Sequence, residues 1–300
     1  MSKKLLLGII IVLVITNIAS LFFWNSGERE TVDSDDGNQT LKTEDVIASV
    51  NGDEIPYEEW MATLRDKHGE SELRSMIDRE VVRKLAEEKD IEIDEKIIDR
   101  EISMIAAMQG VMSEEAFERE KESWREDIIY RYQLEFLLTE DANISEEDVE
   151  QHYNVYQNQY DFTSSLQLSH IVVEDTDTAD KVIEELDQGA SFDLLAQEYS
   201  IDEETNSDGG YLGFIYTTSQ FMPDGYEGVA AEMEENSYSE PFAAGQGIAI
   251  IYLHRALPSI EFSYEEMKPY VESELGLHEL DKSLSADTLW DEMEIDWVYE

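Results

Sequence analysis

The residue best placed to do chemistry in this chain is a histidine inside an apolar strand pattern. His170 lies within residues 166–173, where the alternation of side chains and the β-branched residues predict a strand. An imidazole can hold or transfer a proton near neutral pH, but a lone histidine with such neighbours is also common as a satisfied core residue. The chain has no cysteine. Thiolate nucleophiles, disulfides and sulfur-ligated metal sites are therefore excluded.

Three further patterns must position this histidine. Residues 191–200 carry apolar side chains at helical spacing, and residues 247–253 form an unbroken apolar run typical of a buried strand. Between them, residues 206–213 contain Gly209 and Gly210, which supply the positive φ angles that a sharp chain reversal requires. The stretch from 166 to 253 thus reads as one α+β unit.

This stretch resembles the parvulin family of peptidyl-prolyl isomerases. The matching pieces, in the family's order, are S-H-I-V-V at 169–173, F-x-x-L-A-x-x-Y-S-x-D at 192–202, G-G-x-L-G at 209–213, the segment 221–227, and S-x-P-F at 239–242. The resemblance implies a four-stranded antiparallel sheet with helices. It also implies rotation about X-Pro bonds, a reaction that needs no metal, cofactor or covalent intermediate.

The resemblance also assigns site residues. It implies His170 and Asp202 as catalytic residues, and it implies four substrate-binding residues that would grip the proline ring: Leu212, Phe221, Met222 and Tyr226. The alignment of the last three shifts by one if Gly225 is an inserted residue.

The chain departs from the family pattern in its closing strand. Parvulins usually have G-Y-H-I-I there, whereas residues 247–251 are G-I-A-I-I, so Ala249 replaces the second histidine. His254 lies five residues further on and is expected on the opposite face of the strand. We therefore expect an imidazole without its usual partner, which turns to Asp202 or to a hydroxyl. We also expect weak activity that depends more on the apolar pocket than on His170.

Composition limits the partners. Among 300 residues, 71 are acidic and 21 are Lys or Arg, which gives a formal net charge of −50, while 42% are hydrophobic. Such a field would repel a polyanion, so nucleic-acid binding is excluded. A solvated surface suited to high salt explains the acidic excess better than metal chemistry, because no acidic run fits a calcium loop.

The N-terminus has the pattern of a membrane anchor. Lys3 and Lys4 precede an apolar run, Leu5 to Trp24, and twenty helical residues at about 1.5 Å each just cross a hydrocarbon core of about 30 Å. The positive-inside rule then places the N-terminus in the cytoplasm and the remaining chain outside. A cleaved signal peptide is the competing interpretation.

Helical patterns flank the parvulin-like stretch on both sides. A V-N-G start at 50–52 and a helical series to about residue 160 are similar to the N-terminal region of PrsA- and SurA-like foldases. Apolar residues of this series suit either an adaptable surface or a core: Met104, Met108, Met112, Phe117 and Trp124. A helix starting near Ser263 cannot bury its apolar face alone, so we expect it to return to these N-terminal helices.

The predicted domains are an anchor at 1–25, a flexible linker at 26–44 and an all-α chaperone region at 45–164. A parvulin-like domain follows at 165–257, and C-terminal helices at 258–300 pack on the N-terminal region. The favoured function is a single-pass membrane-anchored extracytoplasmic isomerase and chaperone for unfolded exported polypeptides with X-Pro bonds. The alternative is a non-catalytic holdase with a degenerate parvulin domain. A structural scaffold ranks third, and a homodimer is left open.

Overall fold

The computed structural model describes residues 42–43, 45–245, 247–280 and 284–299, and the chain divides into two compact units, Met1–Glu70 and Ser71–Glu300. In the first unit, β1 (Val46–Val50) and β2 (Asp53–Pro56) form an antiparallel hairpin. Its turn residues Asn51 and Gly52 have φ of 54° and 97°, as an Asn-Gly hairpin requires. The region predicted as all-α therefore begins with two strands, because this two-residue turn pairs its flanking segments.

The helical part of the structure consists of α2 (Tyr57–Glu88), α3 (Glu95–Ala106), α4 (Glu114–Thr139), α5 (Glu146–Tyr160) and α9 (Tyr264–Glu279). Side chains of Asp94, Ser113, Ser145 and Ser263 each accept a hydrogen bond from a backbone N–H of the first turn. These caps satisfy donors that would otherwise lack a partner, and they fix where four of the helices begin.

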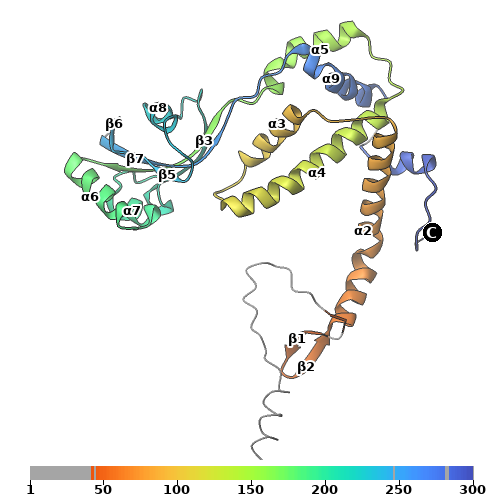
Figure 1. Ribbon diagram of the computed structural model, residues 1–300, viewed down its shortest axis with the longest axis horizontal. Helices are drawn as coiled ribbons and strands as arrows, with labels where there is room; N and C mark the ends of the chain where they lie inside the picture. Colours follow the sequence, from red (N-terminus) through yellow and green to blue (C-terminus); the bar gives the residue numbers. More distant parts are fainter. Residues whose placement is uncertain (1–41, 44, 246, 281–283, 300) are drawn as a thin grey trace, which may run out of the picture. The chain divides into compact units, whose positions relative to one another are not determined.

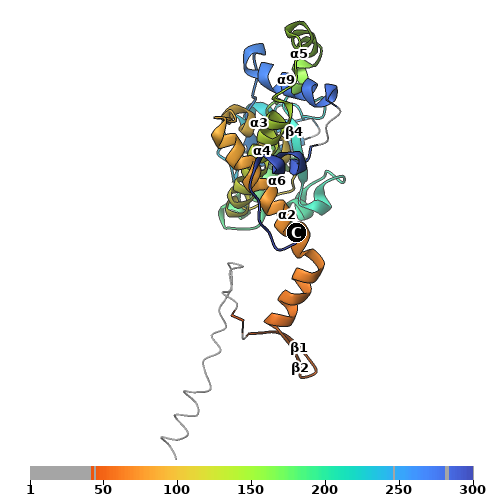
Figure 2. The same cartoon turned by 90° about the vertical axis from the view of Figure 1, so that its right-hand side faces the viewer.

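The C-terminal helix α9 lies beside α5 and also contacts α4 (Figure 1 and Figure 2). Six buried side chains form the core there: Ile97, Val149, Tyr153, Phe262, Met267 and Val271. The last helix of the described residues, a 3-10 helix (Ala286–Glu292), places Leu289 and Trp290 against Val81, Leu85 and Leu134. The apolar surface buried in these two contacts stabilises the helices by about 25 cal/mol for each Å² removed from water.

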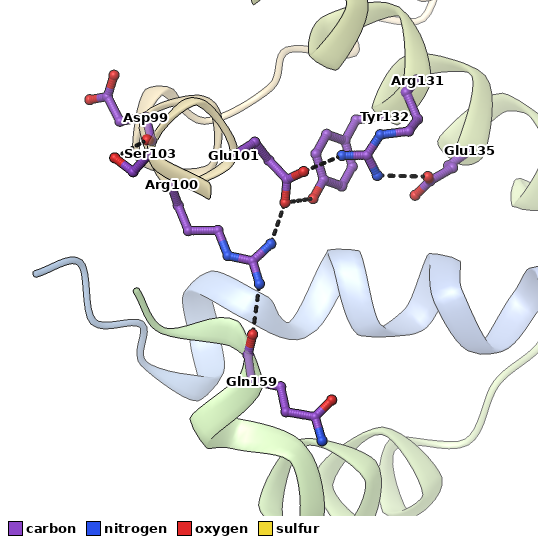
Figure 3. Close-up of polar contacts among 8 residues, drawn as sticks. All are labelled: Asp99, Arg100, Glu101, Ser103, Arg131, Tyr132, Glu135 and Gln159. Carbon is purple, nitrogen blue, oxygen red and sulfur yellow. Dashed lines mark hydrogen bonds and ion pairs between the residues drawn. The ribbon is translucent and has the colours of Figure 1, made fainter. Parts of the chain in front are cut away.

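A polar network crosses the helical core (Figure 3). Arg131 of α4 donates to Glu101 of α3 over 2.6 Å and to Glu135 over 3.3 Å. Arg100 pairs with Glu101 and donates to the Gln159 carbonyl of α5 over 2.6 Å. Burial raises the pKa of the Glu135 carboxyl. Because each charge has a partner of opposite sign, the network ties α3, α4 and α5 together without leaving a buried ion unpaired.

The Met-rich segment divides between core and surface. Phe117 is buried with Ala106 and Leu257, and Trp124 packs against the same cluster. Met104 is 42% exposed and Met108 is 85% exposed. Phe117 and Trp124 of α4 thus belong to the core, whereas Met104 of α3 and Met108, which follows α3, are exposed to solvent.

The parvulin-like sheet is built on two long antiparallel strands, β3 (Ser165–Val173) and β7 (Gly247–Leu257). β4 (Tyr211–Tyr216) pairs with the outer edge of β3. Both β5 (Ser237–Tyr238) and β6 (Phe242–Ala244) pair with β7. The sheet has five strands rather than the predicted four. The long β7 accommodates two short partners because Pro241, which cannot donate to a ladder, lies between them.

Helices cover both faces of this sheet (Figure 1). On one face, α6 (Thr176–Asp187) and α7 (Phe192–Tyr199) pack on a buried cluster that contains Ile171, Val173 and Ile250. On the other, α8 (Tyr226–Ala230) packs on the cluster of Leu168, Val172 and Ile251. Strand alternation places His170 on the α8 face.

The apolar run from Leu5 to Trp24 lies outside the described residues. Within the part of the chain that the structure describes, none of the helices is both long enough and apolar enough to cross a membrane.

Candidate active site

The imidazole of His170 is held at both ring nitrogens. Nδ1 lies 2.8 Å from the Tyr226 hydroxyl, and Nε2 lies 2.7 Å from Asp202 Oδ2 and 3.1 Å from Thr205 Oγ1. Thr205 also donates to Asp202 Oδ2 over 2.5 Å. Strand β3 supplies the histidine, the segment after α7 supplies Asp202 and Thr205, and α8 supplies Tyr226. Three separate parts of the unit therefore converge on one ring.

These contacts fix the tautomer of the neutral imidazole. An ionised carboxylate only accepts hydrogen bonds, so Nε2 must carry the hydrogen that points to Asp202. The single hydroxyl hydrogen of Thr205 is already donated to Asp202. Nδ1 then accepts from the Tyr226 hydroxyl. The expectation that the imidazole turns to Asp202 or to a hydroxyl is confirmed, because a carboxylate and two hydroxyls contact the ring where the second histidine is missing.

The replacement of the second histidine leaves an apolar position. Ala249 is fully buried and pairs with Val172 on one side and Phe242 on the other. The Tyr226 ring, 1% exposed, packs edge-on against both His170 and Phe242, with ring centroids 5.9 Å and 5.4 Å apart. The family resemblance implied that Tyr226 belongs to the apolar pocket alone. Its hydroxyl also contacts Nδ1 of His170.

The glycine turn sets the position of His170 through the backbone. The His170 N–H donates to the Gly210 carbonyl over 2.8 Å. A Cβ on Gly210 would lie 2.0 Å from the His170 carbonyl oxygen, and Gly210 has φ of +76°. Only glycine allows this approach, since a side chain would collide with the strand that carries the histidine.

The predicted substrate-binding residues do not all lie together. Leu212 and Met222 are half-buried against the cluster that contains Tyr226, and so is Phe242. Phe221 is 76% exposed, and its N–H donates to Ser219 Oγ in the turn that precedes α8. Phe221 is not among the residues packed on this cluster, whereas the Phe242 ring packs against Tyr226. Thr205 and Phe242 were both missed. The spacing of Thr205, three residues after Asp202, was the available signal.

The electrostatics favour an ionised carboxylate. Burial, the largest influence, acts to raise the pKa of Asp202, but hydrogen bonds from Thr205 and His170 together hold that pKa below its ordinary value. Burial, and then the Asp202 charge, raise the pKa of the Tyr226 hydroxyl, which stays protonated and available to donate.

His254 lies on the other face of the sheet, as its distance along the strand predicted. Its Nε2 is 2.8 Å from Ser169 Oγ, and its ring packs against Tyr211 and Tyr252. Ser169 precedes His170 and therefore points the opposite way. His254 cannot take part in the His170 site.

Comparison with known proteins identifies the unit. Residues 173–255 match the family described as Rotamase, PPIC-type PPIASE domain. YacD of Bacillus subtilis, provisionally named a peptidyl-prolyl cis-trans isomerase, is 35% identical over 254 residues, which cover 84% of this chain and 85% of YacD. The chain belongs to the PpiC-type peptidyl-prolyl isomerase family. Its enzyme class is therefore the one that the parvulin motifs predicted.

Other similar proteins are foldases and chaperones. The foldase protein PrsA of Halalkalibacterium halodurans is 28% identical over 241 residues, 76% of this chain and 69% of that protein. A solved SurA-like chaperone of Campylobacter jejuni covers 85% of this chain and 100% of its own at 18% identity, with a TM-score of 0.36.

Proposed function

We propose that this isomerase is a membrane-anchored extracytoplasmic foldase that speeds X-Pro isomerisation in exported polypeptides through the Tyr226–His170–Asp202 chain. An amide barrier of about 18–20 kcal/mol makes the uncatalysed X-Pro step take tens to hundreds of seconds. The similarity to foldases supports the role. Residues 5–24 support the anchor, since they are apolar and follow two lysines.

The observation that carries the catalytic proposal is the gradient of exposure along the hydrogen-bonded chain. The Tyr226 residue is 1% exposed, the His170 side chain 9% and the Asp202 side chain 27%. Asp202 is thus the polar group that faces a bound polypeptide, and the two rings behind it hold it in place. We assign Asp202 as the catalytic carboxylate and His170 as the residue that positions it.

A fixed carboxylate beside the prolyl carbonyl would favour the twisted amide. The planar amide owes its stiffness to resonance that places negative charge on the carbonyl oxygen. A nearby negative charge raises the energy of that form more than that of the twisted form, in which the oxygen is less charged. Leu212, Met222 and Phe242 would hold the proline ring and exclude water, which strengthens the effect. Binding the twisted form better than the planar form is what lowers the barrier.

Exchange NMR on an Ala-Pro peptide tests this proposal without a coupling protease. The wild type should raise the exchange rate above the uncatalysed value, and Asp202→Asn, which keeps the shape and removes the charge, should lower kcat/KM at least tenfold. His254→Asn, on the opposite face, is the matched control and should retain activity. A wild type at the uncatalysed rate would refute the isomerase mechanism.

The holdase alternative has one observation in its favour, the apolar Ala249 where the family usually has histidine. It predicts that client aggregation is suppressed without any peptide turnover. Light scattering of a refolding client, measured on the wild type and Asp202→Asn in parallel, separates the two functions. Equal suppression by both proteins, with no turnover by either, would leave the holdase.

A further inference from the structure

The parvulin-like unit has no basic side chain of its own around the site. The chain contains 21 Lys and Arg residues, and none lies between Lys181 and Arg255, whereas 15 Asp and Glu residues do. The two flanking cations are occupied: Lys181 Nζ lies 2.6 Å from the Tyr199 hydroxyl, and Arg255 lies 3.0 Å from Glu114. No positive charge of this segment is thus free to face a substrate.

Several of these carboxylates belong to residues close in sequence to those that contact His170. Glu203 and Glu204 directly follow Asp202, and Asp224 and Glu227 flank Tyr226 within two residues. All four are exposed. Because consecutive Cα atoms are about 3.8 Å apart, each has its backbone within about 8 Å of a residue that contacts His170. Among the described residues, none of these four is part of an ion pair, since the pairs of this segment use Glu185, Asp202 and Glu235.

We infer that this site selects cationic substrates, namely X-Pro bonds flanked by Lys or Arg, and disfavours segments flanked by Asp or Glu. The inference rests on the proposed function, because it takes the isomerase site to bind an extended polypeptide. The four carboxylates named above, the acidic rim, would then determine which polypeptides this site prefers. Four like charges around one site raise the local concentration of a cationic segment and repel an anionic one. The net negative charge of the whole chain would also favour a cationic peptide, and the charge-matched variants below separate that effect from the four carboxylates at the site.

The experiment uses three acetylated and amidated peptides that differ only at the two positions flanking Ala-Pro-Ala, with Lys, Gln or Glu at both. Exchange NMR gives kcat/KM for each with the full-length protein. At about 10 mM salt, where the Debye length is about 30 Å, the Lys peptide should exceed the Glu peptide about tenfold, with Gln between them. At about 1 M salt, where the Debye length is about 3 Å, the ratio should fall below about twofold.

A pair of charge-matched variants tests the location. Glu203→Lys with Glu204→Lys should bring the Lys-to-Glu ratio at low salt to about one. Asp180→Lys with Glu184→Lys makes the same change in net charge on the exposed side of α6, which covers the opposite face of the sheet, and should keep the tenfold ratio.

The outcomes are distinguishable from those that test the proposed function. Turnover of the Gln peptide with equal rates for Lys and Glu would refute the charge selection and leave the isomerase intact. An equal loss of selection in both variants would assign it to net charge and overturn the role of the rim. Uncatalysed rates for all three peptides would overturn the proposed function and this inference with it.

Discussion

The hydroxyl of Tyr226 can be removed with little other change, by Tyr226→Phe. The ring would keep its edge-on contacts with His170 and Phe242, while Nδ1 of His170 would lose the donor that now lies 2.8 Å away. His170 is only 7% exposed, so water does not readily replace that donor. A buried acceptor left without its partner costs about 1–3 kcal/mol.

Part of this cost should appear in catalysis. The hydroxyl holds the imidazole, and the imidazole holds Asp202, so its loss should let the carboxylate take up other positions. If about 1–2 kcal/mol of transition-state stabilisation is lost, kcat/KM should fall about 5- to 30-fold. Exchange NMR on the Gln-flanked peptide measures this ratio, and thermal unfolding of the same samples reports the stability loss.

Tyr153→Phe is the matched control. Tyr153 is also a buried tyrosine, 8% exposed, whose hydroxyl donates over 2.8 Å to the Phe262 carbonyl in the helical core. Its removal should lower stability by a similar amount and leave kcat/KM within twofold of the wild type. If folded Tyr226→Phe keeps the wild-type kcat/KM, the argument that the hydroxyl positions His170 is refuted.

Three further outcomes follow from the site. Gly210→Ala should lower the free energy of unfolding by more than about 3 kcal/mol, because its Cβ would collide with the His170 carbonyl. Gly213→Ala is the control: Gly213 has φ of +79° with open space around it, so this variant should cost only about 1–2 kcal/mol of backbone strain. Chemical denaturation measures both values. Because the pKa of Asp202 is lowered in the folded protein, its ionised carboxylate stabilises the fold at pH values above the ordinary Asp pKa of about 3.9, and this stability is lost as pH falls through the lowered pKa. Asp202→Asn should therefore reduce the loss of stability at acid pH in a pH–stability profile. An unchanged loss would contradict the hydrogen bonds assigned to this carboxylate. Ala249→His should not raise the exchange rate, because His170 already has a partner at each ring nitrogen, and it should cost about 1–3 kcal/mol by overpacking. A faster enzyme would contradict this reasoning and show that a second histidine can still be accommodated.

Local signals were enough for much of the fold. The alternation of residues 166–173 predicted β3, and the helix start expected near Ser263 is confirmed by its cap. An Asn-Gly dipeptide favours a two-residue hairpin turn, and Asn51 and Gly52 form one between β1 and β2. These signals work because they depend on side-chain period, φ preference and hydrogen bonds within one turn. The predicted number of strands was wrong, since β5 and β6 are too short to show the alternation of side chains that identifies a strand.

The sequence by itself determined the family, the enzyme class, the placement of Asp202 three residues before Thr205, and the need for glycine at 210. Only the tertiary structure decided which hydroxyls contact His170 and which phenylalanine packs against Tyr226. The Tyr226–His170 contact joins residues 56 positions apart, and Phe221 and Phe242 look alike as residue types although one is 76% exposed and the other half-buried. Such choices depend on the packing of α8 against β3 and β7, and no local pattern in the chain encodes that packing.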